Sequence, residues 1–189
     1  VHKHNGLLKA SIMTAQNAHR LGANEAPPAI VSAFLGTQLT AILDKLENST
    51  SEEAIIIDDK KQLHLGIPSI PEVFLDNTDR NRTSPFAFTG NKFELRMLGS
   101  SLSASFANTV ISTIVADSLK VIADRLDDFK YLQDVRDEAL KIIQEIMRKH
   151  HRVLFSGDGY SNDWVVEAAE RGLPNIKSFV EAIEFLDND

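Results

Sequence analysis

The stretch NRTSPFAFTGNKFELRM, residues 81–97, decides the fold that we expect for this chain of 189 residues. Two apolar-rich runs, 86–88 and 93–97, flank Thr89–Lys92. A glycine followed by an asparagine between two such runs is typical of a tight hairpin turn. The stretch therefore predicts an antiparallel strand pair. Because side chains alternate along a strand, Glu94 and Arg96 should lie side by side on one face of it.

Helical periodicity dominates the rest of the sequence. Apolar residues recur every three or four positions over 7–19, about 27–47, 106–126 and 132–147. Two shorter helices are expected, one capped by Ser161 and ending near Gly172, the other over about 178–186. The fold class is therefore α+β: mainly helical, with one short antiparallel strand pair and with helices throughout 103–189.

The region 48–70 gives no single prediction. Residues 54–57 and 62–67 could form a second hairpin around the charged tetrad 58–61. The tetrad could equally lie on the solvated face of a helix. Prolines at 68 and 71 favour an extended backbone where the region ends.

The composition excludes several classes of protein. With 20 basic and 27 acidic residues the net charge is −7, which argues against a general binder of nucleic acid or anionic membranes. The absence of cysteine excludes disulfides, thiolate nucleophiles and cysteine metal sites. We find no unbroken apolar run near the ~20 residues that a membrane helix needs, and no signal peptide. We therefore expect a soluble, cytoplasmic protein and, since the sequence opens at Val1, a fragment or processed product.

Two polar segments could carry chemistry. One is the loop 20–28, in which Glu25 lies among small residues and prolines. The other is 79–96, where Arg80, Arg82, Arg96 and Glu94 fall within 17 residues. Arginine binds carboxylate and phosphate oxygens in pairs, and a carboxylate suits a hard divalent cation. The alternative reading is that these side chains form ordinary surface ion pairs.

Three segments resemble glutamine synthetase. Residues 20–27, RLGANEAP, are similar to the glutamate flap of that family; 80–84, RNRTS, to its arginine-rich substrate segment; and 92–96, KFELR, to its metal-and-arginine strand. The wording of 81–94, together with 4–8 and 157–161, resembles the type III form in particular. The resemblance implies that 1–189 is the carboxy-terminal portion of the catalytic domain, with 48–70 as a variable insertion.

The resemblance implies the activity: ligation of ammonia to glutamate at the expense of ATP, through γ-glutamyl phosphate. Glu25 would be catalytic, closing over the site and taking a proton from ammonium. Arg82 would also be catalytic, stabilising charge on the phosphoryl group. Arg80 and Arg82 would bind the phosphates of the nucleotide.

The remaining roles concern substrate and metal. The resemblance implies that Arg20 and Arg96 bind substrate carboxylates and that Glu94 ligates Mg²⁺ or Mn²⁺. Two departures from the commoner family forms are visible. The flap is one residue shorter between Arg20 and Glu25 than in those forms, and those forms carry a second arginine five residues after the one matching Arg82. Ala87 occupies that position here.

The implied partners are glutamate, ammonia and ATP, within a ring-forming homo-oligomer, by resemblance a dodecamer, with no nucleic acid and no membrane. The family's other metal ligands and most nucleotide contacts lie upstream of a segment like this one. We therefore expect this chain to be inactive by itself. The alternative is a helical interaction or oligomerisation module whose arginines and Glu94 form structural ion pairs.

Overall fold

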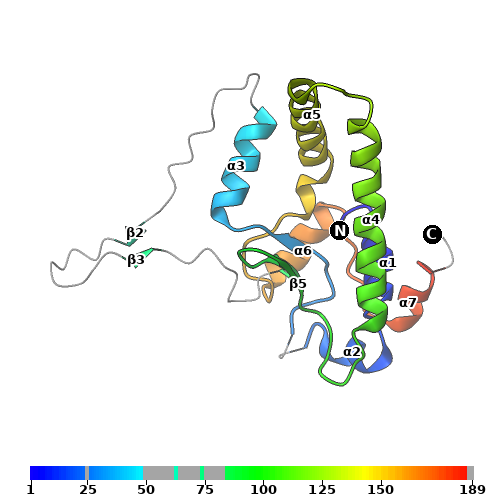
Figure 1. Cartoon of the computed structure of the whole chain (residues 1–189). Coiled ribbons are helices and arrows are strands. Elements are labelled where there is room, and N and C mark those ends of the chain that lie inside the picture. The colour runs from blue at the N-terminus through cyan, green and yellow to red at the C-terminus, as the bar shows by residue number, and fades with distance from the viewer. Residues whose placement is uncertain (24–25, 49–61, 64–72, 75–83, 187–189) are drawn as a thin grey trace.

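The computed structural model describes residues 1–23, 26–48, 62–63, 73–74 and 84–186. Over these ranges it is α+β, as predicted, with helices packed around a small three-stranded sheet (Figure 1). The strand order is β1 (Ala33–Phe34), β4 (Phe86–Phe88) and β5 (Phe93–Leu95). β1 runs parallel to β4, and β4 runs antiparallel to β5.

The predicted hairpin is confirmed. Phe86 pairs with Leu95, Ala87 with Glu94, and Phe88 with Phe93. At the turn the Thr89 amide donates to the Lys92 carbonyl at 2.8 Å. Gly90 takes a φ of 97°, which a residue with a side chain rarely adopts.

The helix predicted over about 27–47 is wrong in its first third. The structure has β1 there, and helix α3 begins only at Thr37 (Thr37–Asn48). Residues 29–33 are all buried, so an extended segment shows apolar residues on both faces and is easily mistaken for a helical stripe. Gly36, with a φ of 83°, separates the strand from the helix.

The helix predicted over 7–19 is two helices, α1 (Asn5–Ala10) and α2 (Ala15–Arg20). The break falls at Thr14, whose hydroxyl accepts a hydrogen bond from the Asn17 amide at 3.3 Å and so caps α2. A local cap of this kind satisfies an amide that a continuous helix would have bonded within itself.

The helices of the second half are confirmed. They are α4 (Ser105–Leu126), α5 (Leu132–His150), the 3₁₀ turn η1 (His151–Val153), α6 (Asn162–Glu170) and α7 (Phe179–Ile183). Ser161 caps α6 by accepting from the Asp163 amide at 3.0 Å, as predicted. Gly172, with a φ of 70°, follows the end of that helix.

Two apolar clusters form the core. The first joins α1, the segment after β5 and the inner side of α4, and contains Leu8, Ile12, Met97 and Ile114. The second joins β1, η1 and α6 and contains Trp164, whose ring stacks on Phe155 at 3.6 Å between centroids. Leu95 of β5 packs against the first cluster and Phe86 of β4 packs against the second, so both clusters fix the hairpin.

Helix α4 bears on the expectation that the chain has no segment suited to cross a membrane. Among the described residues, it is the one helix whose length and composition would allow this, although polar residues interrupt its apolar stretches. Only 17% of its most apolar window is buried in this structure. A core helix of a larger protein passes the same test.

Most of 48–70 lies outside the described residues, and so does the choice between hairpin and helix for 54–61. The part that is described, β2 (Gln62–Leu63), pairs antiparallel with β3 (Val73–Phe74).

Candidate functional site

Glu94 and Arg96 form the centre of the candidate site. They lie on one face of the strand that ends the hairpin, and the Arg96 Nε atom donates to Glu94 Oε2 at 3.1 Å. The contact that the alternation of strand side chains predicted is therefore confirmed. Ala87 lies directly across from Glu94 and is fully buried. The small side chain at 87 leaves this face of the hairpin to the two charged residues.

The Glu94 carboxylate is strongly favoured in its ionised form. Lys92 Nζ lies 3.0 Å from Oε1, and the Thr89 hydroxyl donates to the same oxygen at 3.3 Å. The hydrogen bonds from Lys92 and then Arg96 hold the pKa of the Glu94 carboxyl below its usual range. Glu94 thus offers a partly exposed, negatively charged oxygen donor at neutral pH.

Arg20 is fixed where β5 leads into the following loop. Its Nη2 donates to the Met97 carbonyl at 2.6 Å, and its Nε donates to Asn17 Oδ1 at 3.1 Å. The position of Arg20 is therefore tied to Met97, the residue that follows the other predicted arginine, Arg96.

Asn17 holds this arrangement, and the sequence analysis missed it. Its amide nitrogen donates to the carbonyls of Ile12 and Met97, both at 2.8 Å, and the residue is almost fully buried. It therefore ties α2 to the end of β5 and orients Arg20. The one available signal was an asparagine on the inner side of an otherwise apolar helical pattern.

The loop that contains Glu25 is closed by its own backbone. The Gly22 amide donates to the Pro27 carbonyl at 2.9 Å, and the Ala26 amide donates to the Ala23 carbonyl at 3.1 Å. Ala26 is buried, at 3% exposure. Glu25 itself lies outside the described residues. The described residues that flank it, Gly22, Ala23, Ala26 and Pro27, are held by these two hydrogen bonds and follow Arg20 closely in the chain.

Comparison with known proteins identifies the family. The family model of the glutamine synthetase C-terminal domain matches residues 138–189. The chain is 48% identical to a glutamine synthetase of Bacteroides fragilis (strain YCH46), across 100% of this chain and 26% of that relative. It is 45% identical to a type-3 glutamine synthetase of Dictyostelium discoideum (98% and 25%) and 38% identical to a glutamine synthetase of Butyrivibrio fibrisolvens (97% and 25%). The chain belongs to the glutamine synthetase family. It spans about a quarter of the length of these relatives.

The arginine-rich segment predicted from the glutamine synthetase resemblance cannot be placed beside Glu94. Arg80 and Arg82 lie outside the described residues. Ser84, which follows them closely, is buried, and its hydroxyl donates to the Phe155 carbonyl at 2.9 Å and accepts from Ser32 at 3.0 Å. Of the predicted site residues, the structure thus joins Glu94 to Arg96 and bonds Arg20 to the carbonyl of the neighbouring Met97.

A divalent ion of the kind that glutamine synthetase relatives imply finds one suitable ligand in the described part of the chain. Glu94 is an ionised carboxylate, the donor that Mg²⁺ and Mn²⁺ prefer. No group of three or more His, Asp or Glu residues that could hold a metal occurs among the described residues. Glu94 therefore fits one position of a metal site and needs further carboxylates from elsewhere.

The other face of the hairpin is apolar. Phe86 and Phe93 stack at 4.9 Å between ring centroids and line a groove of about 530 Å³ that continues along α4 and α5. Val121 and Ile146 also line it and are exposed. The strand pair therefore separates a charged face from an apolar one.

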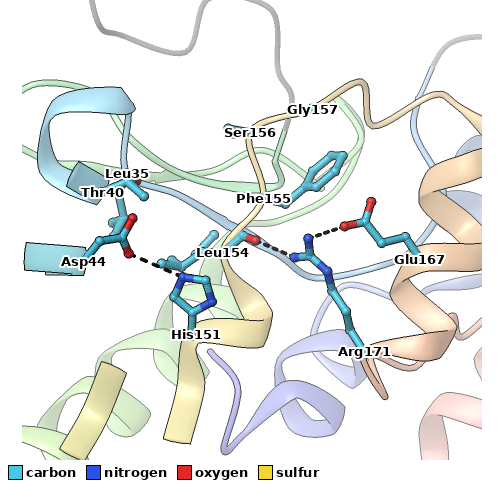
Figure 2. Close-up of a pocket in the computed structure, with 11 residues that line it drawn as sticks. Leu35, Thr40, Asp44, His151, Leu154, Phe155, Ser156, Gly157, Glu167 and Arg171 are labelled. Atoms are coloured by element: carbon cyan, nitrogen blue, oxygen red, sulfur yellow. Dashed lines mark hydrogen bonds and ion pairs between the residues drawn. The ribbon is translucent and has the colours of Figure 1, made fainter. Parts of the chain in front are cut away.

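A second groove, of about 380 Å³, lies between α3, the segment 154–157 and α6 (Figure 2). Its charged residues pair with one another: His151 lies 3.5 Å from Asp44, and Arg171 bonds Glu167 and the Leu154 carbonyl. None of the predicted site residues lines it. Because its charges already have partners, this groove adds nothing to the candidate site.

Proposed function

We propose that this chain is the carboxy-terminal part of the catalytic domain of a glutamate–ammonia ligase. In the full-length parent the reaction is the ATP-dependent ligation of ammonia to glutamate, through γ-glutamyl phosphate. The observation that carries the proposal is the pairing of Glu94 with Arg96 on the hairpin, with Arg20 bonded to the carbonyl of the next residue, in a chain 48% identical to a glutamine synthetase throughout. A guanidinium group beside an ionised carboxylate suits a site for an anionic substrate and a cation together.

Arg96 and Arg20 have the part of binding substrate carboxylates in this proposal. A guanidinium presents its donors in a rigid fork, which orients a carboxylate as well as attracting it. Arg96 is mostly buried, with 18% of its side chain exposed, so its charge is less screened by water than that of a surface arginine. Asn17 and the Met97 carbonyl hold Arg20 in place, so little ordering remains for substrate binding to supply.

Glu94 would hold one of the divalent ions, Mg²⁺ or Mn²⁺. Such an ion, when bound, neutralises phosphate oxygens of ATP and of the transferred phosphoryl group. The part of Glu94 is to supply a charged oxygen ligand at a fixed point of the hairpin. Lys92 and Arg96 keep that oxygen ionised at neutral pH, because their hydrogen bonds lower its pKa.

Three residues outside the described part complete the proposed machinery. Glu25 would close over the site and accept the proton of ammonium, since a loop carboxylate attracts a cation and closure excludes water from an acyl phosphate. Arg82 would stabilise the phosphoryl group in transfer, and Arg80 would bind phosphate. The described residues that flank Glu25 lie next to Arg20 in the chain and bond one another, Gly22 to Pro27 and Ala26 to Ala23, which supports a role for this segment beside Arg20.

We further propose that the 189 residues alone are inactive. Catalysis requires all metal ligands and nucleotide contacts to be positioned together, and the described residues supply one carboxylate for the metal. By its resemblance to glutamine synthetases, the parent would act as a homo-oligomer.

The test is glutamine formation from glutamate, ammonia and ATP by the full-length parent. Glu25→Ala, Arg82→Ala and Arg96→Ala should each lower kcat by about 100-fold or more while assembly persists. The matched control is Arg136→Ala on α5, an exposed arginine away from the hairpin, which should leave turnover unchanged. Absence of glutamine formation by the unaltered parent with either Mg²⁺ or Mn²⁺ would refute the proposal.

The alternative function, a helical interaction module, has one observation in its favour. Glu94 is fully occupied by Lys92, Thr89 and Arg96 in this structure, as a purely structural ion pair would be. The two functions differ in the effect of Glu94→Gln on the full-length parent. If Glu94 is a metal ligand, this change should raise the Mg²⁺ concentration needed for half-maximal activity. If Glu94 forms only a structural pair, the change should alter stability and leave that concentration the same.

A further inference from the structure

The outward face of α4 has an unusual composition for a surface in contact with water. Residues spaced alternately by four and three positions form one line along a helix. On α4 such a line consists of small or apolar residues, all of them exposed: Ser105, Thr109, Ser112, Ala116, Leu119 and Ala123. The opposite side of α4 carries Val110 and Ile114, which are buried against α1. The helix is therefore apolar on its packed side and uncharged along this exposed line.

Three hydroxyl groups of α4 bond to their own helix. Thr109 Oγ1, on this line, donates to the Ser105 carbonyl at 2.9 Å, and Thr113 Oγ1, beside the line, donates to the Thr109 carbonyl at 2.8 Å. Ser118 donates in the same way to Ile114 at 2.8 Å. A hydroxyl bonded to its own helix can be buried without leaving a donor unsatisfied. Thr109 can therefore lose its water at little cost.

A lipid bilayer is a poor occupant of this face, although α4 is long and apolar enough. Asp117, near the middle of the helix, pairs with Lys3 at 2.7 Å and with His4 at 3.2 Å. In a spanning orientation these charges would lie at the centre of the hydrocarbon layer, where charged groups are costly. α4 also packs on α1 and α5 along its other side.

The relatives indicate a different occupant. This chain covers 25–26% of each of them, so roughly three quarters of each relative's length lies outside the match. A surface on the same polypeptide is present at a high effective concentration and binds such a face ahead of a separate molecule. The small residues along the line would let its backbone come close.

We infer that the α4 face formed by Ser105, Thr109, Ser112, Ala116 and Leu119 is covered by an uncharged, mainly apolar surface of the same polypeptide outside these 189 residues. This inference rests on the proposal that the chain is part of a longer ligase. The cover ends near Lys120 and Asp124, which bond each other at 2.8–2.9 Å and are exposed. An ion pair of this kind is expected at the wet rim of an interface.

Thiol labelling tests the inference, because the chain contains no cysteine. Ala116→Cys and the nearly isosteric Ser112→Cys would probe the face, and Asp124→Cys would serve as the matched control at the rim. Each variant is made in the 189-residue chain and in the full-length parent. The rate of reaction with a maleimide is measured by mass spectrometry on the peptide that carries the new cysteine, so cysteines elsewhere in the parent do not interfere.

We expect the maleimide to modify cysteines at positions 112 and 116 at least about tenfold more slowly in the parent than in the short chain. The cysteine at position 124 should react at about the same rate in both. Equal rates at 112 and 116 in the two proteins would overturn the inference. So would protection, in either protein, that grows with its concentration, since a second copy would then be the cover. Protection of the short chain by phosphatidylcholine vesicles would assign the face to a bilayer and also overturn it.

The readout is separate from activity. Slow labelling in a parent that makes no glutamine would retain the packing inference and refute the ligase proposal. Fast labelling in an active parent would do the reverse.

Discussion

The two long helices, α4 and α5, lie next to each other and pack in the same molecule, yet their exposed faces differ in kind (Figure 1). α5 carries charged and amide groups that bond to groups outside it: Glu138 and Glu145 to Arg125, and Gln144 to the Leu46 carbonyl. On α4 the outward line up to Leu119 is uncharged, and its threonines bond to their own helix.

The difference teaches that exposure in a structure does not by itself identify a surface adapted to water. α5 is an amphipathic helix: its outer side carries polar groups, and its inner side carries the buried Ile142 and Met147. α4 has charged residues only from Asp117 onward, and its outward line up to Leu119 is small or apolar, which is unusual for a helix face in contact with water. The experiments below separate the inner side of α4, its outer side and its junction with α5.

The largest expected effect lies at Lys9 of α1, a helix that packs on α4. This lysine is fully buried, donates to the Pro174 carbonyl, and has its pKa lowered by burial from 10.5 to about 7. Between pH 7 and 10.5 the unfolded state therefore binds more protons than the folded state. The free energy of unfolding should rise with pH across this window, by up to about 1.4 kcal/mol per pH unit. Below pH 7 the amine is protonated in both states, so Lys9 adds no further slope.

Urea unfolding of the chain at pH 7, 8 and 9 measures that slope. Lys9→Met should remove it, whereas Lys130→Met, at an exposed position, should leave it unchanged. The same slope in the Lys9→Met variant would show that the amine is charged in the folded protein.

The next effect compares the two sides of α4 directly. Ile114 is 6% exposed and Leu119 is 59% exposed, five positions along the same helix. Ile114→Ala should lower the free energy of unfolding of the 189-residue chain by about 2–4 kcal/mol, because it removes packed methyl groups and leaves a cavity. Leu119→Ala should change it by less than about 0.5 kcal/mol.

Chemical denaturation measures the free energy of unfolding of both variants, and the two values can be compared when the m-values agree. Equal losses in the short chain would mean that the outer face is already covered there, which would remove the contrast between α4 and α5. In the full-length parent the loss at Leu119 should approach that at Ile114.

The sequence predicted much of this fold because its strongest signals are local. The Gly90–Asn91 turn, the Ser161 cap and the long periodic runs of α4 and α5 each involve neighbouring residues, and all four were placed correctly. Segment 29–33 failed for the opposite reason. Its burial on both faces comes from distant helices, and periodicity cannot distinguish such a strand from a helical stripe.

The candidate site divides in the same way. The contact of Glu94 with Arg96 follows from strand alternation alone and could be predicted. The position of Arg20 depends on Asn17 and the Met97 carbonyl, which are 80 residues apart in sequence, and no local rule reveals it. The roles of Glu25, Arg80 and Arg82 come only from family resemblance and stay predictions.

A smaller effect is expected at the junction of the two helices. Arg125 of α4 bonds Glu138 and Glu145 of α5, and these hydrogen bonds raise the pKa of the Arg125 guanidinium above its already high value. Arg125→Gln should lower the thermal midpoint of the chain by less than Ile114→Ala does, because Arg125 and Glu145 are exposed to water and only Glu138 is mostly buried. The loss should shrink in about 1 M salt, where charges are screened within about 3 Å. A loss that is independent of salt would assign the role of Arg125 to packing of its stem rather than to its charge.

The smallest effect is expected at Thr113, and it is the sharpest test of the outer face of α4. Its hydroxyl bonds only the Thr109 carbonyl among the contacts described, so Thr113→Val should alter the free energy of unfolding by less than about 0.5 kcal/mol. Thr113→Asp should also be tolerated in the 189-residue chain, where water can hydrate the carboxylate. In the full-length parent the two substitutions should part, because a covered face accepts valine and rejects a charge that has no partner. Equal tolerance of both in the parent, measured by thermal unfolding, would place Thr113 in water and return α4 to the same class of surface as α5.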